Sequence, residues 1–532
     1  MHQQFGTLNW LAIAVYIVAM LAVGVYFSKR AGASSDDYFK AGGRIPAWAA
    51  GFSIYATTLS AITFMSIPEK AYLTDWAYSA GNIAIFAIVP ILVYYYVPFF
   101  RKLDVTTAYE YLEERFDVVL RVFGSLFFVL FHIGRIAIVI YLPTLALTAV
   151  SDINPYLIAG LVGIACVIYT FLGGMEGVIW SDVIQGIILL SGALVVIVVA
   201  LVNSPGSITH TLSEAASDGK FYSGQNFTFS DLSVSIPIIF LGSVLNNLQS
   251  YTASQDVVQR YQTTPSVQAT KGSLYVNGCL ALITIPIFYG MGTALYTYYQ
   301  GNGGFPDDVN TSAIVPYYIL TELPGGVAGL IIGGILAAAQ STISSSLNSI
   351  SACITVDIRN RLMPGRGEAS VLFSRMIIVI TGLFSTGVAL WLIASDKGEL
   401  WDLFLTLTGL FGIPIAAVFA LGIFTVRANR FGVLAGLLLG AVSGYFMNQT
   451  DLGPFMISIV AFAVTLVAGY LLSIPLAGAA KATRTETLPL TIHGKDLSYQ
   501  RKAARREALN DEAASVIPDT DDPTEPKSVA QV

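Results

Sequence analysis

Residues 46–68 read PAWAAGFSIYATTLSAITFMSIP, a segment long and apolar enough to cross a bilayer as a helix but weak at its centre. The central residues 56–60, ATTLS, are small, hydroxylated or β-branched, and Thr and Ser side chains compete with a helix for backbone hydrogen bonds. Non-helical backbone at mid-membrane depth is tolerated only where it lines a cavity or is buried in protein. The segment therefore predicts either a broken spanning helix that exposes carbonyl groups or a Ser/Thr-rich packing face.

The rest of the chain has the composition of a membrane protein. Of its 532 residues, 55% are hydrophobic and only 12% are charged, whereas soluble domains are roughly 25% charged. The three cysteines lie singly in apolar stretches, which is typical of small buried hydrophobes. The sequence has no Ser/His/Asp grouping, metal-ligand cluster or ATP-binding loop, so neither an enzyme nor an ATP-driven pump is expected. Nucleic-acid binding has no support either.

Thirteen stretches are apolar enough to be spans, given that a helix needs about 20 residues to cross the hydrocarbon core. They fall near residues 8–28, 46–66, 76–99, 122–149, 155–172, 176–202, 233–255, 273–297, 325–355, 371–394, 399–424, 431–447 and 453–475. The sequence thus predicts an all-α membrane protein with about 13 transmembrane helices.

Basic residues predict the orientation of these spans, because cytoplasmic loops retain Lys and Arg. With the N-terminus outside, 24 of the 28 basic residues fall in cytoplasmic segments, three in outside loops and one, Arg135, inside a span. Arg260 is counted in the cytoplasmic loop after the seventh span. We therefore expect the N-terminus outside and the C-terminus in the cytoplasm. The polar residues from 478 onward are too few and too hydrophilic to bury a core.

A second polar run, residues 338–346, lies in the inner half of the ninth span. Within it Ser341, Ser344 and Ser345 share one helical face by their i, i+3 and i+4 spacing. Hydroxyl oxygens are hard neutral ligands that suit a hard cation such as sodium when a carboxylate lies nearby. Close packing between helices, where Ser and Ala are common, explains the run equally well.

Two ionisable residues inside spans favour function over packing, because a charge at the bilayer centre costs roughly 2.5–3.5 kcal/mol on insertion scales. Asp182, at the start of the sixth span, could neutralise a bound cation, or it could cap a helix near the cytoplasmic interface. Arg135 lies at the middle of the fourth span, and its planar guanidinium could bind a carboxylate through two parallel hydrogen bonds. Its alternative partners are a backbone carbonyl or a distant Asp. His132 is interpreted as a hydrogen-bonded packing residue.

Several segments, taken in order, resemble the sodium/solute symporter family: YATTLSAITFMSIP, FHIGR, YTFLGGMEGVIWSDVIQG, TASQDVVQRY and AAAQSTISSSLNSIS. The resemblance covers about residues 10–475 and is nearest to bacterial sialic acid–sodium symporters. It implies a bacterial inner-membrane protein with a LeuT-type core of two inverted five-helix repeats, in which the first helix of each repeat is broken. The implied domains are residues 1–45 with an extra helix and cytoplasmic loop, 46–424 with the ten-helix core, 425–477 with two further helices, and 478–532 as a disordered cytoplasmic tail.

The resemblance also implies two sodium sites, carried over residue by residue. The first resembles a site built from the carbonyls of Ala56, Leu59 and Ala338 and the hydroxyls of Ser341 and Thr342. Thr342 replaces a serine of the family pattern but keeps its oxygen. The second resembles a site built from Asp182, Ser341, Ser344 and Ser345.

On the substrate side, the resemblance implies a pocket that holds the carboxylate of a sialic acid. Its residues are Thr58, Ser60, Thr63, Tyr78, Asn82 and Arg135, with the arginine on the carboxylate. Asn82 stands where a Gln is expected, Tyr78 where a Phe is expected, and Ser243 where an aromatic gate residue is expected. The carboxylate contact is therefore better supported than the identity of the sugar.

Together these features predict a sodium-coupled symporter that imports a small carboxylated solute, N-acetylneuraminate being the expected one, by alternating access with two Na⁺. We expect a functional monomer in lipid. A sodium symporter for a neutral sugar, polyol or amino acid is the nearest alternative. A channel is another, and so is a membrane sensor with a transporter-like domain, although the polar tail is too short for an output domain.

Overall fold

The computed structural model describes residues 6–31, 35–59, 61–103, 105–148, 153–222, 235–307, 309–363, 369–395, 404, 406–450, 452, 454–476 and 490–491. These residues form helices and connecting turns, with no strand among them. Within them, nine helices are long and apolar enough to span a membrane, and a bent pair of helices makes a tenth candidate. Shorter apolar helices cover Pro155–Ile168 and Thr408–Phe424. The all-helical membrane fold is confirmed, whereas the count of 13 spans stays a prediction. The expected tail lies outside the described residues, apart from 490–491.

The bounds of the helices are as follows. They are α1 (Thr7–Ala31), α2 (Ser35–Lys40), α3 (Ala47–Thr58), α4 (Ala61–Leu73), α5 (Ala80–Ile91), α6 (Val97–Leu103), α7 (Glu110–Arg115), α8 (Val118–Thr148), α9 (Pro155–Asn203), α10 (Ile208–Ser217), α11 (Ile236–Thr252), α12 (Gln255–Tyr261), α13 (Val267–Thr284), α14 (Gly290–Gly301), α15 (Ile314–Glu322), α16 (Val327–Ala352), α17 (Val371–Ala394), α19 (Ile413–Phe424), α20 (Arg430–Met447) and α21 (Pro454–Ser473).

Two sets of helices follow the same plan. Each set begins with a helix in two pieces, α3 with α4 and α11 with α12, and continues with a helix interrupted by a π-helical turn, η3 (Leu92–Tyr96) or η5 (Ile285–Tyr289). Three more helices follow in each set: α8 and the two parts of α9 in the first, and α16, α17 and the shorter α19 in the second. The two parts of α9 meet at Gly174, whose φ of 54° and ψ of −160° interrupt the helix.

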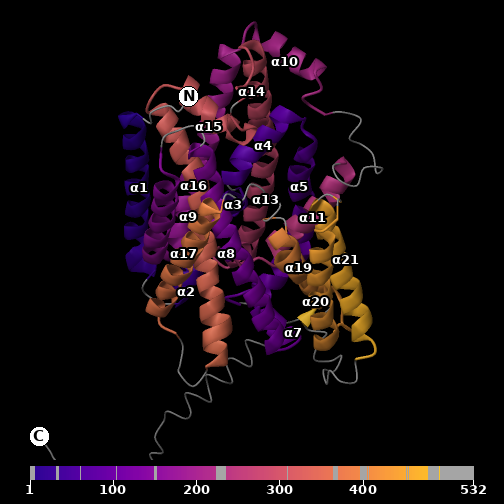
Figure 1. The fold of residues 1–532 in the computed structure, drawn as a ribbon. Helices are drawn as coiled ribbons and strands as arrows, with labels where there is room; N and C mark the ends of the chain where they lie inside the picture. Colours follow the sequence, from indigo (N-terminus) through magenta and orange to yellow (C-terminus); the bar gives the residue numbers. More distant parts are fainter. Residues whose placement is uncertain are drawn as a thin grey trace, which may run out of the picture.

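The packing between the two sets is reciprocal. The first helix of each set packs against the second helix of the other, since α3 contacts α13 and α11 contacts α5. Likewise α16 packs on α9, and α8 packs on α17. Such an exchange of partners is what two related five-helix repeats produce. The extra helices α1 and α20–α21 lie at opposite sides of this core (Figure 1).

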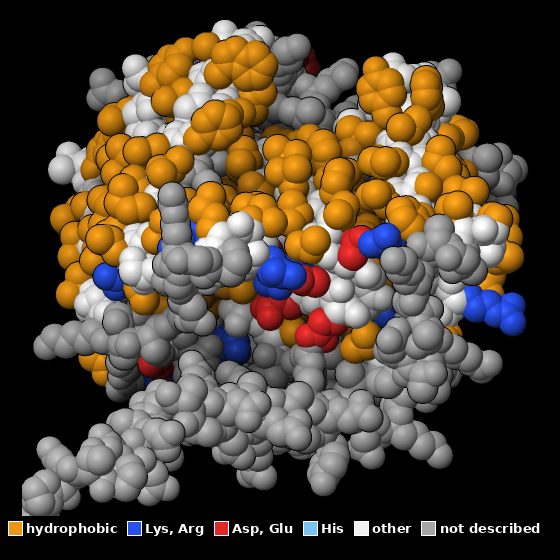
Figure 2. Space-filling model, turned by 90° about the horizontal axis from the view of Figure 1, so that it is seen from below, with side chains coloured by type: hydrophobic (Ala, Val, Ile, Leu, Met, Phe, Trp, Pro, Cys, Tyr) orange, Lys and Arg blue, Asp and Glu red, His pale blue; other side chains and the backbone are white. Residues whose placement is uncertain are grey.

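One end of the bundle carries a cluster of charged side chains. α1 begins at the end where α10 and α14 lie, and α21 runs down to the other end, near α7 (Figure 1). Viewed from the α7 end, acidic and basic side chains gather among hydrophobic ones (Figure 2). Glu113 there forms ion pairs with Arg121 at 2.8 Å and Arg361 at 2.5 Å. Burial raises the pKa of Glu113, but the hydrogen bonds from these two arginines outweigh it and lower the pKa, so the cluster remains charged at neutral pH.

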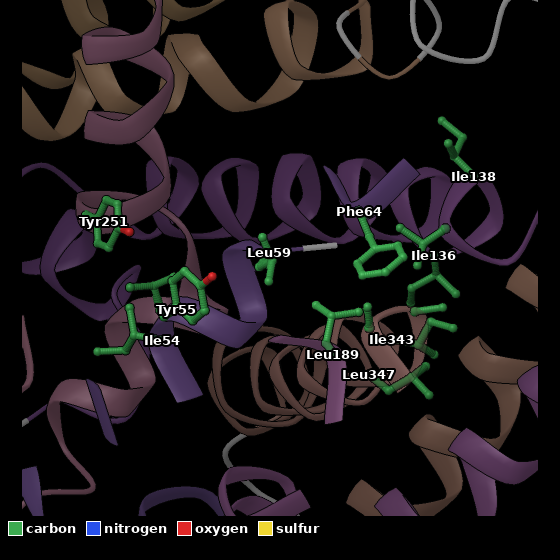
Figure 3. Packing of buried hydrophobic residues seen from close by; sticks show 14 of the residues in the cluster. Ile54, Tyr55, Leu59, Phe64, Ile136, Ile138, Leu189, Tyr251, Ile343 and Leu347 are labelled. Atoms are coloured by element: carbon green, nitrogen blue, oxygen red, sulfur yellow. The ribbon is translucent and has the colours of Figure 1, made fainter. Parts of the chain in front are cut away.

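Around the break between α3 and α4, a hydrophobic core joins both repeats. Leu59 and Phe64 belong to it together with Ile136 of α8 and Ile343 of α16. Figure 3 shows Phe64 beside Ile136, with Ile343 of α16 close to both. The core therefore holds the two pieces of the broken helix against α8 and α16.

The close packing of α3 on α13 depends on Gly51. A Cβ added at Gly51 would lie 2.3 Å from the carbonyl oxygen of Ser273. We expect Gly51→Ala to destabilise the protein by roughly 1–3 kcal/mol, because overpacking a tight helix contact forces the backbones apart. The measurement is the thermal unfolding midpoint in detergent. Gly160→Ala in α9 is the control, since a Cβ there meets no atom within 4 Å; equal midpoints for the two variants would contradict the prediction.

Candidate functional site

The predicted break in the second span is confirmed. α3 ends at Thr58, and Leu59 leaves the helical conformation with φ −81° and ψ 108°. The Thr58 hydroxyl donates to the carbonyl of Tyr55 at 2.9 Å, which is the competition for backbone acceptors expected from the ATTLS run. The helix bends by 61° across the break before it continues as α4. Ser60 lies outside the described residues.

The polar face of α16 lies against this break. α16 contacts both α3 and α4, and the hydroxyls of Thr57 and Ser345 lie 3.2 Å apart. All five residues expected for the first sodium site are buried: Ala56, Leu59, Ala338, Ser341 and Thr342. The Thr342 hydroxyl points back along its helix and donates to the carbonyl of Ala338 at 3.4 Å. The structure thus brings the two segments together, as the prediction of a shared cation site requires.

Asp182 lies at the meeting point of α3, α9, α12 and α16. Its carboxylate is fully buried and accepts hydrogen bonds from the hydroxyl of Ser341 at 2.8 Å and from that of Ser53. The alternative in which Asp182 caps a helix is wrong, because it lies eight residues past the break at Gly174 and its carboxylate accepts from the side chains of Ser53, Ser341 and Arg260. Ser344 donates to the carbonyl of Ser341 at 3.1 Å. The residues expected for the second sodium site are therefore adjacent to one another.

Arg260, which is not among the predicted site residues, also lies in this group. The expectation that Arg260 lies in a loop is wrong, because the side chain is fully buried on α12, the second piece of a broken helix; its assignment to the cytoplasmic side stays a prediction. Its guanidinium donates to Asp182 at 2.8 Å and to Ser345 at 2.6 Å. The buried carboxylate of Asp182 provides the counter-charge that lets an arginine occupy this position. In this structure the cation beside Asp182 is therefore Arg260.

Arg135 reaches both alternative partners that the sequence left open. Its Nη1 lies 3.3 Å from the carboxylate of Asp256, and its Nη2 donates to the carbonyl of Thr57 at 3.1 Å. Asp256 also accepts from the hydroxyl of Ser254 at 2.5 Å. The side chain of Arg135 is 13% exposed, whereas that of Asp256 is 2% exposed, so only the arginine keeps an open edge.

His132 supports this group as a packing residue. Its Nδ1 lies 2.8 Å from the hydroxyl of Ser346, and its Nε2 lies 3.3 Å from that of Ser254. These contacts join α8 to α16 and to the start of α12, as expected for a buried hydrogen-bonded histidine.

The remaining residues expected for the substrate pocket lie on α4, α5 and the turn before α5. Thr63 is half-buried on α4. Asn82 on α5 donates to the carbonyl of Ala281 at 3.3 Å. The ring of Tyr78 lies 6.3 Å from that of Phe455 on α21. Asn82 and Tyr78 thus contact α13 and α21, whereas Arg135 contacts α3 and α12.

The residues missed from the sequence are Asp256, Arg260, Ser53 and Ser254. One signal could have found the first two: within TASQDVVQRY, Asp256 and Arg260 are opposite charges four residues apart in a segment that adjoins a span.

The sodium:solute symporter family model matches residues 38–440. The chain belongs to this family. Among curated relatives, the sodium/sialic acid symporter NanT of Aliivibrio fischeri is 47% identical over 88% of this chain and 93% of that protein. SiaT of Proteus mirabilis, also a sodium/sialic acid symporter, is 45% identical over 87% of this chain and 94% of its own length. Human sodium-coupled monocarboxylate transporter 1 is 31% identical over 82% of this chain and 72% of its length.

Solved structures agree with this family assignment. A substrate-bound, outward-open structure of a Na⁺-coupled sialic acid symporter superposes with a TM-score of 0.84 at 44% identity, covering 89% of this chain and 98% of the other. Mhp1, a nucleobase-cation-symport-1 family transporter, matches with a TM-score of 0.57 at 14% identity over 84% of this chain and 96% of the other, which shows the fold alone. The LeuT-type fold is confirmed. As a sodium:solute symporter, the chain is a multi-pass membrane transporter that uses Na⁺, and it is not an enzyme.

Proposed function

We propose that the chain is a sodium-coupled symporter that imports a sialic acid, N-acetylneuraminate or a close analogue, across a bacterial inner membrane. The observation that carries the proposal is the position of Thr57 at the end of α3. Its carbonyl accepts from Arg135 at 3.1 Å, and its hydroxyl lies 3.2 Å from that of Ser345. Residues suited to a carboxylate and residues suited to a cation therefore meet at one residue of the broken helix. The names of the NanT and SiaT relatives support the sugar acid.

The charges favour coupling to two sodium ions. Moving one elementary charge through the membrane potential is worth about 2.3 kcal/mol per 100 mV, so a monoanion alone enters a negative cell against the field. With two Na⁺ and one carboxylate, a net positive charge moves inward, and both the potential and the sodium gradient drive uptake. In this proposal Na⁺ holds the break of α3 against α16 while the acid binds, and the helices then rock to open the cytoplasmic side.

The first sodium site can be tested at Thr342. Thr342→Val removes the hydroxyl while nearly keeping the shape, and losing one oxygen ligand should lower the apparent sodium affinity about tenfold, since a buried polar contact contributes roughly 1–1.5 kcal/mol. Thr342→Ser retains the oxygen and should stay close to the unmodified protein. The measurement is the sodium dependence of uptake at a fixed acid concentration. Normal sodium affinity in the valine variant would exclude Thr342 as a ligand.

We also propose how the chain is oriented in the membrane and how it is divided into domains. The N-terminus lies outside and the α7 end of the bundle faces the cytoplasm, which the charged cluster at that end supports (Figure 2). A single chain surrounded by lipid carries out transport. The domain bounds at 45, 424 and 477 divide the extra N-terminal helix, the core, the two C-terminal helices and the tail.

Uptake into proteoliposomes tests the function as a whole. With an inward sodium gradient, labelled N-acetylneuraminate should accumulate above its outside concentration, and uptake should rise when the interior is made negative. Replacing sodium by potassium should abolish it. Competition by neutral sugars, polyols, amino acids and short monocarboxylates separates the alternatives; accumulation of a neutral solute in place of the acid would overturn the proposal.

A further inference from the structure

α12 (Gln255–Tyr261) carries two buried charges of opposite sign one helical turn apart. Both Asp256 and Arg260 are fully buried. Each faces a residue of a proposed binding site, since Asp256 faces Arg135 and Arg260 faces Asp182. The helix thus places an anion where the carboxylate of the cargo is expected and a cation where the second Na⁺ is expected.

The two contacts differ in strength. Arg260 is held firmly, because its guanidinium donates to Asp182 at 2.8 Å, to Ser53 at 2.8 Å and to Ser345 at 2.6 Å. Arg135 and Asp256 share a single contact of 3.3 Å, longer than the roughly 2.7–2.9 Å usual for charge-assisted hydrogen bonds. A carboxylate that binds both guanidinium nitrogens of Arg135 would satisfy it better than Asp256 does.

Once released, the two residues can satisfy each other. Asp256 and Arg260 have i, i+4 spacing with the acid nearer the N-terminus, the arrangement that favours ion pairs on a helix. The Nη1 of Arg260 already donates to the backbone carbonyl of Asp256. The two side chains therefore lie one turn apart on the same helix, close enough for the pairing proposed below.

We propose that Asp256 and Arg260 are positioning residues that couple the binding of Na⁺ to the binding of the acid. The inference rests on the proposed function. Together with Arg135 and Asp182 they form a group of zero net charge. Sodium alone displaces Arg260 from Asp182 and leaves a buried cation without its partner. The acid alone displaces Asp256 from Arg135 and leaves a buried anion without its partner. Each unpaired buried charge costs free energy, so each cargo binds weakly by itself. When both cargoes bind, Asp256 and Arg260 pair, so each cargo strengthens the binding of the other reciprocally.

The experiment measures this coupling on the purified full-length protein. The Kd of N-acetylneuraminate is determined calorimetrically in saturating Na⁺ and with N-methyl-D-glucamine in place of Na⁺, and the coupling ratio is the second Kd divided by the first. Coupling between sites is typically about 5- to 150-fold, and we expect the unmodified protein to fall in this range. Asp256→Asn should lower the ratio at least threefold, because acid binding without sodium becomes tighter.

Arg260→Gln should lower the ratio by a similar factor. In that variant sodium binding without acid becomes tighter, which appears as a shift of the sodium titration of the unfolding midpoint to lower concentration. The double variant Asp256→Asn/Arg260→Gln should have the same coupling ratio as either single variant, because the two residues act as a unit. If the two residues acted independently, the double variant would lower the coupling ratio by the product of the two single factors. Asp256→Glu, which keeps the charge, should restore most of the coupling.

The matched control is Asp357→Asn. Asp357 is a buried carboxylate that accepts from Arg121 at 2.8 Å and from Ser125 at 2.6 Å, with no proposed cargo contact, so its loss should lower stability but keep the coupling ratio. A ratio of one, or no acid binding, in the unmodified protein would be a failure of the proposed function. The coupling role is overturned if the unmodified protein has a coupling ratio of about 5 or more and the folded Asp256 and Arg260 variants have ratios within twofold of it. If a single variant does not fold, the charge-balanced double variant decides.

Discussion

Replacing Arg135 with alanine is expected to weaken the binding of N-acetylneuraminate about 100-fold or more, since truncating one partner of a buried charge pair costs roughly 2–5 kcal/mol. The structure adds a second reason for a large effect. Asp256, which contacts Arg135 at 3.3 Å, would lose its partner and face the incoming carboxylate as a like charge. Arg135→Lys should also bind weakly, because an ammonium cannot contact the acid with the planar two-nitrogen geometry of a guanidinium.

Two further variants separate recognition from folding. Arg135→Ala/Asp256→Ala removes both charges, so it should recover stability relative to Arg135→Ala without recovering acid affinity. Arg115→Gln is the matched control: Arg115 is a buried arginine that donates to the backbone carbonyls of Gly422 and Thr425, and its loss should leave acid affinity unchanged. Calorimetric Kd values and uptake kinetics provide the measurement. Near-normal acid affinity in Arg135→Ala would refute the carboxylate contact.

Asp182→Ala is expected to have two separable consequences. Arg260 would remain buried with no carboxylate, and breaking a buried ion pair by removing one partner costs roughly 3–5 kcal/mol of stability. The Hill coefficient for sodium in uptake assays should fall from near two to near one, because the second sodium site loses its only charged ligand while the residues of the first site, except for the neighbouring Ser341, are untouched. Some transport should remain.

The pair Asp182→Ala/Arg260→Gln distinguishes these consequences. Removing both charges should recover much of the lost thermal stability, because no unpaired buried charge is left. The Hill coefficient should nevertheless stay near one, since the carboxylate is still absent. A coefficient near two in either folded variant would count against a sodium ion at Asp182 and would leave the Asp182–Arg260 pair as a structural contact.

Much of the site could be predicted from local patterns. The break at Leu59 follows from the hydroxylated ATTLS run, because Thr58 competes for backbone acceptors within its own helix turn. The common face of Ser341, Ser344 and Ser345 follows from helical spacing alone. Arg135 and Asp182 stand out because a charge within an apolar span is costly. Each of these inferences needs only a few consecutive residues.

Only the tertiary structure decided which buried charges form ion pairs with each other. Arg260 pairs with Asp182 across 78 residues of sequence, and Arg135 pairs with Asp256 across 121. These partners depend on how the fold places α12 relative to Arg135 of α8 and Asp182 of α9, and no local pattern records that placement. The sequence by itself determined the apolar helices, the break and the presence of two of the buried charges, Arg135 and Asp182, because these follow from spacing and burial cost. The pairing was decided by the fold, because buried charges are neutralised by whichever groups the packing brings within contact distance.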